Sequence, residues 1–103
     1  MPRTYSEKFL QELTDADPNR LGVCLGRLCV EMNLPATYVA TALNVSRMTV
    51  YSWFRGRGVS ESKRALVETF MKLVKDDAKA GILPASNMAE AKTYIQEMLG
   101  ISI

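Results

Sequence analysis

Apolar residues recur at intervals of three and four along most of the chain, and no segment shows the strict alternation of a half-buried strand. This pattern predicts helices over residues 6–13, 18–32, 61–80 and 88–99, with two further short helices between 36 and 55. The first two apolar stripes consist of Phe9, Leu10 and Leu13, and of Leu21, Cys24, Leu25, Leu28 and Met32. The last two consist of Leu66, Val67, Phe70, Leu73 and Val74, and of Met88, Ala91, Ile95, Met98 and Leu99. We therefore expect an all-α chain, built as a small helical bundle.

Local signals place the ends of these helices. Asp17 followed by Pro18 is an acidic cap with proline in the first turn, which predicts that the second helix starts there. Gly81 predicts the end of the long helix, because glycine adopts the backbone conformation that commonly follows a last turn. Side chains that accept amide hydrogen bonds predict the other N-caps. These N-caps are Ser6, Ser46, Ser60 and Asn87, the last with Glu90 in the manner of a capping box.

Two glycines, Gly22 and Gly26, lie four positions apart within the second predicted helix. Each costs a helix about 1 kcal/mol relative to alanine, so their presence indicates that another backbone comes close. We favour close packing within the chain over packing across a dimer.

The segment from Ala36 to Arg55 combines two short helices around a tight bend. Asn44 occupies the bend, where left-handed backbone is required and asparagine is the best substitute for glycine. Ala40 lies at the expected crossing point of the helices, where a larger side chain would push them apart. The inner apolar set is Val39, Ala40, Leu43, Val45, Val50 and Trp53. We expect Phe54 either to complete the core against the long helix or to stay partly exposed.

The run Leu-Asn-Val-Ser-Arg-Met-Thr-Val-Tyr-Ser-Trp (43–53) resembles the helix-turn-helix of the Cro/CI (lambda repressor-like, xenobiotic-response-element) family of bacterial and phage repressors. The likeness extends over about residues 21–64, and Asn44 stands where the family has glycine. The resemblance implies a helix-turn-helix bundle with C-terminal helices. It also implies a transcriptional regulator, most simply a repressor, that binds double-stranded DNA sequence-specifically. In that family the second helix of the motif, here residues 46–55, enters the major groove.

The same resemblance assigns residues to DNA. The side chains expected at base edges are Arg47, Met48, Tyr51 and Ser52. The side chains expected at phosphates are Thr37, Ser46, Thr49, Arg55, Arg57, Lys63 and Arg64. Arg47 suits a bidentate pair with guanine, and the alternative for its guanidinium is a phosphate contact or a solvated charge.

Positive charge is concentrated on this part of the chain. The whole sequence has 13 basic and 11 acidic residues, a net charge of +2. Residues 47–64 hold five of the basic residues against Glu61 alone, which gives +4 locally and −2 for the remainder. A basic surface beside a groove-reading helix is what phosphate binding requires.

Composition narrows the classes of function. The chain has no histidine and only two cysteines, Cys24 and Cys29, so we expect neither a structural zinc site nor a histidine-assisted nucleophile. We interpret the cysteines as small buried apolar residues, because their spacing sets them on different sides of one helix. We expect no enzyme activity, no metal and no cofactor. The lack of a membrane-length apolar run or a secretory signal predicts a cytoplasmic protein.

We expect one domain with an N-terminal extension carrying a short helix (1–17), a DNA-binding core (18–64) and C-terminal helices (65–103). One such module contacts too few bases for selective binding, so we expect a homodimer formed through the C-terminal third. The apolar residues that suggest this contact are Leu83, Met88, Ile95, Met98, Leu99, Ile101 and Ile103. The alternative is that the last helix only closes the core of the monomer.

Two other functions stay open on the sequence. The order of elements is also similar to that of phage DNA-packaging subunits, which place a helix-turn-helix ahead of oligomerising helices; the long helix over 61–80 would then build a ring. In a third interpretation the motif is a protein-binding module that targets the transcription machinery. The local positive charge favours DNA over this last alternative.

Overall fold

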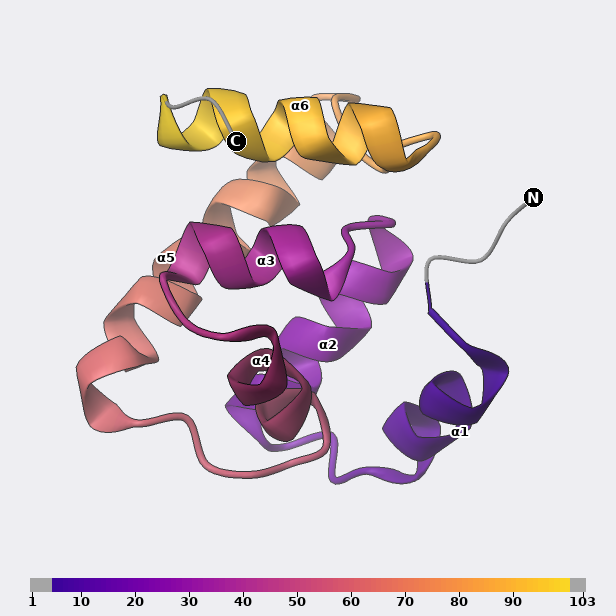
Figure 1. The fold of residues 1–103 in the computed structure, drawn as a ribbon, viewed down its shortest axis with the longest axis vertical. Helices are drawn as coiled ribbons and strands as arrows, with labels where there is room; N and C mark the ends of the chain where they lie inside the picture. Colours follow the sequence, from indigo (N-terminus) through magenta and orange to yellow (C-terminus); the bar gives the residue numbers. More distant parts are fainter. Residues whose placement is uncertain (1–4, 101–103) are drawn as a thin grey trace.

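Six helices make up the part of the chain that the computed structural model describes, residues 5–100 (Figure 1). These helices are α1 (Glu7–Asp15), α2 (Leu21–Glu31), α3 (Ala36–Leu43), α4 (Arg47–Phe54), α5 (Glu61–Lys79) and α6 (Met88–Leu99). No strand occurs within these residues, so the predicted all-α class is confirmed.

The helices pack around α2 and α3. α2 contacts α1, α4 and α5, while α3 contacts α4, α5 and α6. In Figure 1, α4 and α6 lie at opposite ends of the long axis, and α5 leads from the α4 end to the α6 end. The candidate DNA-reading helix is therefore far from the last helix of the chain.

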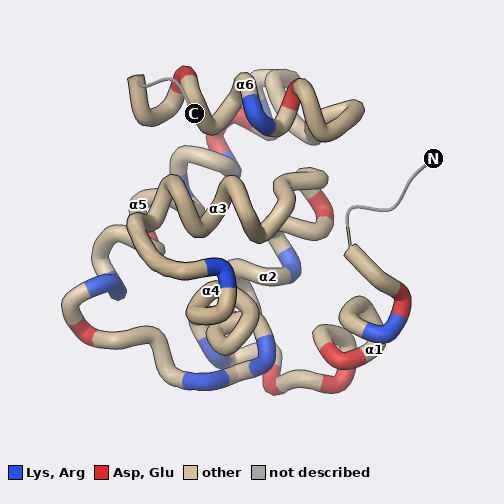
Figure 2. Tube along the Cα trace, in the orientation of Figure 1, with Lys and Arg blue, Asp and Glu red and all other residues tan. Residues whose placement is uncertain are grey.

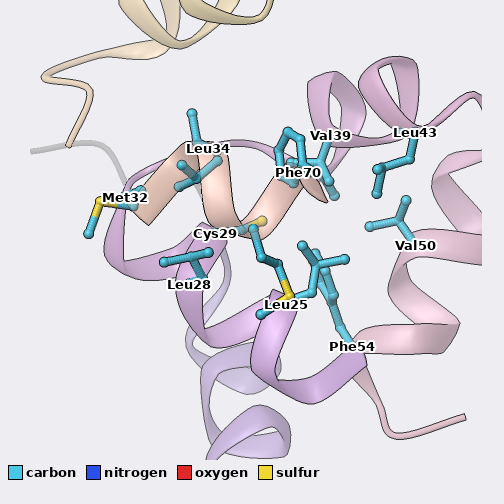
Figure 3. Close-up of a cluster of buried hydrophobic side chains, with 14 of the residues drawn as sticks. Leu25, Leu28, Cys29, Met32, Leu34, Val39, Leu43, Val50, Phe54 and Phe70 are labelled. Atoms are coloured by element: carbon cyan, nitrogen blue, oxygen red, sulfur yellow. The ribbon is translucent and has the colours of Figure 1, made fainter. Parts of the chain in front are cut away.

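The core takes side chains from every helix. Leu43 of α3 and Val50 of α4 are directed toward one another, and Phe70 of α5 lies beside Val39 (Figure 3). No polar or charged residue is buried among residues 5–100, so apolar and aromatic side chains fill this interior. Within the same residues, every buried side-chain nitrogen or oxygen has a hydrogen-bond partner.

Most predicted helix ends are confirmed. Ser6 caps α1 by accepting a hydrogen bond from the Phe9 amide (3.1 Å), and Asn87 caps α6 by accepting one from Glu90 (2.9 Å). The Glu90 carboxylate in turn accepts from the Ser86 amide (3.3 Å), one residue before the position that a capping box uses. Ser60 is at the N-cap of α5, but its hydroxyl makes no hydrogen bond to the helix backbone.

The predicted start of α2 is wrong by several residues, since the helix begins at Leu21 rather than at Pro18. The Asp17 carboxylate accepts from the Asn19 amide (2.9 Å), and the Asp17 carbonyl accepts from Arg20 (3.2 Å). These bonds close a separate turn ahead of the helix. The prediction that Asp17 caps the second helix is therefore wrong, because an aspartate side chain can stabilise a turn as well as a helix start.

The predicted apolar stripe of α5 is also partly wrong. Leu66 and Leu73 are 40% and 45% exposed, whereas Met71, which was not in the predicted stripe, is buried. The buried face of this helix is centred on Val67, Phe70 and Val74, and the two leucines lie at its edge. The spacing of apolar residues predicts which side of a helix is buried, but not how many neighbouring positions the buried face includes.

The C-terminal residues predicted to lie on a dimer surface divide into several groups. Leu83 and Ile95 are buried within the monomer, Met98 and Leu99 are half-buried, and Met88 is 55% exposed. Ile101 and Ile103 lie outside the described residues. For Leu83 and Ile95 the alternative interpretation, closure of the monomer core, is therefore correct.

Candidate nucleic-acid interface

The turn between α3 and α4 has the backbone that its residues predict. Asn44 ends α3 in the left-handed region (φ 56°, ψ 48°), as expected for the residue at the bend. Ser46 then caps α4, because its hydroxyl oxygen accepts from the Thr49 amide (3.1 Å). The Lys63 ammonium group from α5 donates to the carbonyls of Leu43 (3.2 Å) and Asn44 (3.5 Å) at the end of α3. The left-handed backbone at Asn44, the Ser46 cap and the Lys63 ammonium group thus together fix how α4 is placed relative to α3.

The inner edge of α4 is packed into the protein. Val50, Trp53 and Phe54 are all buried, which confirms the predicted inward orientation of Val50 and Trp53. A Cβ on Gly22 would lie 2.3 Å from the Trp53 carbonyl oxygen, so α2 and α4 touch through backbone at this point. The predicted close approach at this glycine is therefore confirmed, and it lies within the chain.

Phe54 completes the core on a different side from the one predicted. Its ring lies 5.8 Å from the ring of Phe9 on α1, and a Cβ on Gly26 would lie 3.0 Å from Phe54 Cγ and 3.0 Å from Leu13 Cδ1. Phe54 thus packs between α1 and α2. Of the two alternatives for Phe54, completion of the core is confirmed and partial exposure is wrong, but the neighbours found here lie on α1 and α2 and not on the long helix named in the prediction.

The outer edge of α4 faces away from the core. Arg47 is exposed and Met48 is 81% exposed, while Ser52, one turn after Met48, is half-buried. The Arg47 guanidinium makes no hydrogen bond or ion pair within residues 5–100. Arg47 and Met48, two of the four residues predicted at base edges, therefore form an accessible face of α4, the candidate reading face, and Tyr51 lines the same groove as both.

Tyr51, another residue predicted at base edges, also packs against neighbouring aromatic rings. Its ring packs edge-on against Phe9 (5.3 Å between ring centroids), and it also meets Phe54 (6.0 Å) and Tyr5 (6.4 Å). These contacts leave Tyr51 half-buried and tie α4 to α1. The Tyr51 ring thus packs on other aromatic rings beside the candidate reading face.

Tyr5 connects this aromatic cluster to the turn between α2 and α3. Its hydroxyl donates to the Leu34 carbonyl, in the turn between α2 and α3. Burial raises the pKa of Tyr5 well above its ordinary value, with smaller contributions from Cys29 and Tyr51. Tyr5 and α1 are therefore part of the folded core.

The residues predicted to contact phosphates differ in whether their side chains already have a hydrogen-bond or ion-pair partner. Thr37 is exposed near the start of α3, and Arg57 is exposed in the loop after α4. The Ser46 and Thr49 hydroxyls are hydrogen-bonded to each other (2.9 Å). Arg64 forms an exposed ion pair with Glu68 within α5 (3.6 Å). Figure 2 shows several basic positions around α4, in the loop that follows it and at the start of α5.

Two predicted phosphate contacts already have partners across helices. Lys63 is half-buried and donates to backbone carbonyls, as described above. The Arg55 Nε donates to Glu12 Oε2 on α1 (3.3 Å), and the Arg55 guanidinium lies 6.0 Å from the Tyr51 ring centroid. Glu12 is a residue that sequence analysis did not consider, and no local pattern connects it to α4.

α1 and α4 enclose an open groove of about 500 Å³. Its lining consists of Ser6, Phe9, Arg47, Met48, Tyr51 and Arg55. The reading face is therefore bordered on one side by α1.

The chain matches no family model, no curated protein and no solved structure in comparisons with known proteins. The candidate interface is therefore argued from its own residues and geometry.

The described residues contain no group of three acidic, cysteine or histidine side chains arranged to hold a metal ion. Both cysteines are free thiols: Cys29 is buried, as predicted, while Cys24 is only half-buried and donates to the Pro18 carbonyl (3.2 Å). No helix in residues 5–100 has the length and apolar composition needed to cross a membrane.

Proposed function

We propose that this protein is a sequence-specific double-stranded DNA-binding regulator of the repressor type, which reads the major groove with α4. The observation that carries this proposal is the division of α4 into a buried edge, with Val50 and Trp53, and an accessible edge, with Arg47 and Met48. A reading helix needs both, because its position must be fixed while its outer side chains reach the bases.

Arg47 is the expected centre of base recognition. It lies in the first turn of α4, is exposed, and has no partner within the described residues. An unpaired guanidinium is suited to the O6 and N7 atoms of guanine, a contact that gives about 1–3 kcal/mol of discrimination. Met48 beside it offers an apolar contact for a thymine methyl group, and Ser52 offers a short hydroxyl for direct or water-mediated contacts.

Phosphate binding is supported by the basic residues around α4. Arg57 and the threonine at the start of α3, Thr37, are both exposed. Arg55 and Arg64 are also exposed, but each must exchange a carboxylate partner for a phosphate. We expect Lys63 to contribute mainly by holding the end of α3, since its ammonium group already donates to carbonyls there.

We further propose a cytoplasmic homodimer without catalytic activity or cofactor. A dimer would present two reading helices to half-sites about one DNA turn apart. The exposed apolar side chains available for it in the C-terminal third are Leu66, Leu73, Ile82 and Met88.

Selection of bound duplexes from a random oligonucleotide pool tests this function. We expect enrichment of one short sequence in an inverted repeat, and a complex whose affinity falls steeply with salt. Solution mass measured on the same sample should correspond to two chains. Recovery of no enriched sequence would contradict the proposal, and a ring of many chains would instead favour an assembly role.

A further inference from the structure

α1 lies along the flank of α4, next to the proposed reading face. The Phe9 ring packs on Tyr51, and one turn further on Glu12 accepts a hydrogen bond from Arg55 (3.3 Å). The two helices thus meet through an aromatic contact and an ion pair, with the groove described above between them.

α1 is held in this place by its buried side. Phe9 and Leu13 are both buried, the latter against Gly26 of α2. Burial of two side chains of this size contributes about 3–6 kcal/mol, far more than an exposed ion pair does. DNA that approaches α4 therefore meets α1 in place as well.

A major groove admits only one of these two helices. The groove is about 12 Å wide and a helix with its side chains is about 10–12 Å across, so α1 must lie outside the groove when α4 is inside it. The neighbour that α1 then meets is the phosphate backbone at the rim. α1 carries three carboxylates and only one ammonium group, and Glu12 lies beside Arg55. These charged residues are Glu7, Glu12, Asp15 and Lys8.

We propose that Glu12 limits sequence-independent DNA binding by this protein. It keeps Arg55 in an intramolecular pair, and it sets a negative charge where a phosphate would otherwise be attracted. This inference rests on the proposed function of α4 as a reading helix. Non-specific complexes depend on phosphate contacts for almost all of their affinity, so a residue that withholds one arginine acts on them directly.

Replacing Glu12 by glutamine should release Arg55 for a phosphate contact. For a duplex of random sequence we expect the affinity to rise about two- to fivefold, the range given by the energy of an exposed ion pair. The slope of the logarithm of affinity against the logarithm of salt concentration should steepen by about one unit, because one more counterion is released.

The experiment measures binding of a random-sequence duplex at several salt concentrations by fluorescence anisotropy. Four chains are compared: the wild type, Glu12→Gln, Arg55→Gln and the double variant. Glu97→Gln is the matched control, because Glu97 is exposed on α6, at the opposite end of the molecule from α4 (Figure 1). Thermal unfolding of each chain checks that the fold is retained.

We expect Glu12→Gln to bind more tightly than the wild type and Glu97→Gln to bind equally. In the Arg55→Gln background, the effect of Glu12→Gln on the salt slope should disappear. If the wild type binds DNA and Glu12→Gln binds no more tightly than the wild type or Glu97→Gln, the inference about Glu12 is wrong. The proposed function would not be affected by that result. The inference is also wrong if Glu12→Gln changes the salt slope by the same amount in the Arg55→Gln background. Failure of both the wild type and Glu12→Gln to bind any duplex would overturn the proposed function, and this inference with it.

Discussion

The two edges of α4 are built from adjacent residues with opposite surroundings. On the inner edge, Val50, Trp53 and Phe54 contact other helices and are buried. On the outer edge, Arg47 and Met48 are exposed and contribute little to packing. An eight-residue helix is too short to be stable alone, so its inner edge must supply its stability. The outer edge is then free to carry recognition chemistry without affecting the fold.

Truncation of one residue on each edge should separate stability from recognition most strongly. Trp53→Ala removes a large buried side chain and should lower the free energy of unfolding by about 3–5 kcal/mol. Met48→Ala should change it by no more than about 0.5 kcal/mol, because Met48 is 81% exposed. Urea unfolding measures both. A similar loss for the two variants would contradict the division of α4 into two edges.

The inner edge also depends on close backbone contact with α2. Gly22→Ala places a methyl group against the Trp53 carbonyl, which cannot move independently of α4, so we expect a loss of about 3 kcal/mol in unfolding free energy. Gly58→Ala is the control, because nothing lies within 4 Å of the added Cβ in the loop after α4. Equal stability of the two variants would show that α2 and α4 tolerate separation.

The outer edge is tested by Arg47→Ala. We expect a loss of about 1–3 kcal/mol in affinity for the selected duplex, about five- to 160-fold, with unfolding free energy unchanged. Specificity should also relax at the base pair that Arg47 reads. A uniform loss of affinity across all sequences would instead identify Arg47 as a phosphate contact, the alternative considered for it from the sequence.

The aromatic cluster behind Tyr51 links stability to alkaline pH. Tyr5 keeps its proton in the folded chain, whereas the unfolded chain loses it above about pH 10. Stability is therefore unaffected by this group below that pH and falls above it, by up to about 1.4 kcal/mol per pH unit. Tyr5→Phe should make the decline shallower by that amount in urea unfolding between pH 8 and pH 11. An unchanged slope would show that Tyr5 is accessible to hydroxide.

Features set by neighbouring residues were predictable from the sequence. Asn44 tolerates left-handed backbone, and Ser46 and Asn87 accept from amides three positions on, so the turn and the start of α6 followed from residue type alone. The inner edge of α4 followed from the spacing of Val50 and Trp53. Because these features are local, neither the packing of distant helices nor a relative of known structure was needed to predict them.

Features set by distant residues were not predictable. Glu12 and Arg55 are 43 positions apart, and nothing in either segment indicates that α1 docks beside α4. Asn33 is a second case, with positive φ (58°) and a side-chain amide that donates to the Ala85 carbonyl (2.9 Å) in the connection between α5 and α6. Such contacts depend on how whole helices pack, which periodicity does not specify.

The central claim is that the outer edge of α4 meets DNA, and methionine methyl resonances test it most directly. Met48 on α4 and Met88 on α6 are both exposed, at opposite ends of the molecule (Figure 1). In a titration of methyl-labelled protein with the selected duplex, we predict a large shift of the Met48 methyl signal and none of the Met88 signal. A Met48 signal that stays in place while the duplex binds would contradict the account.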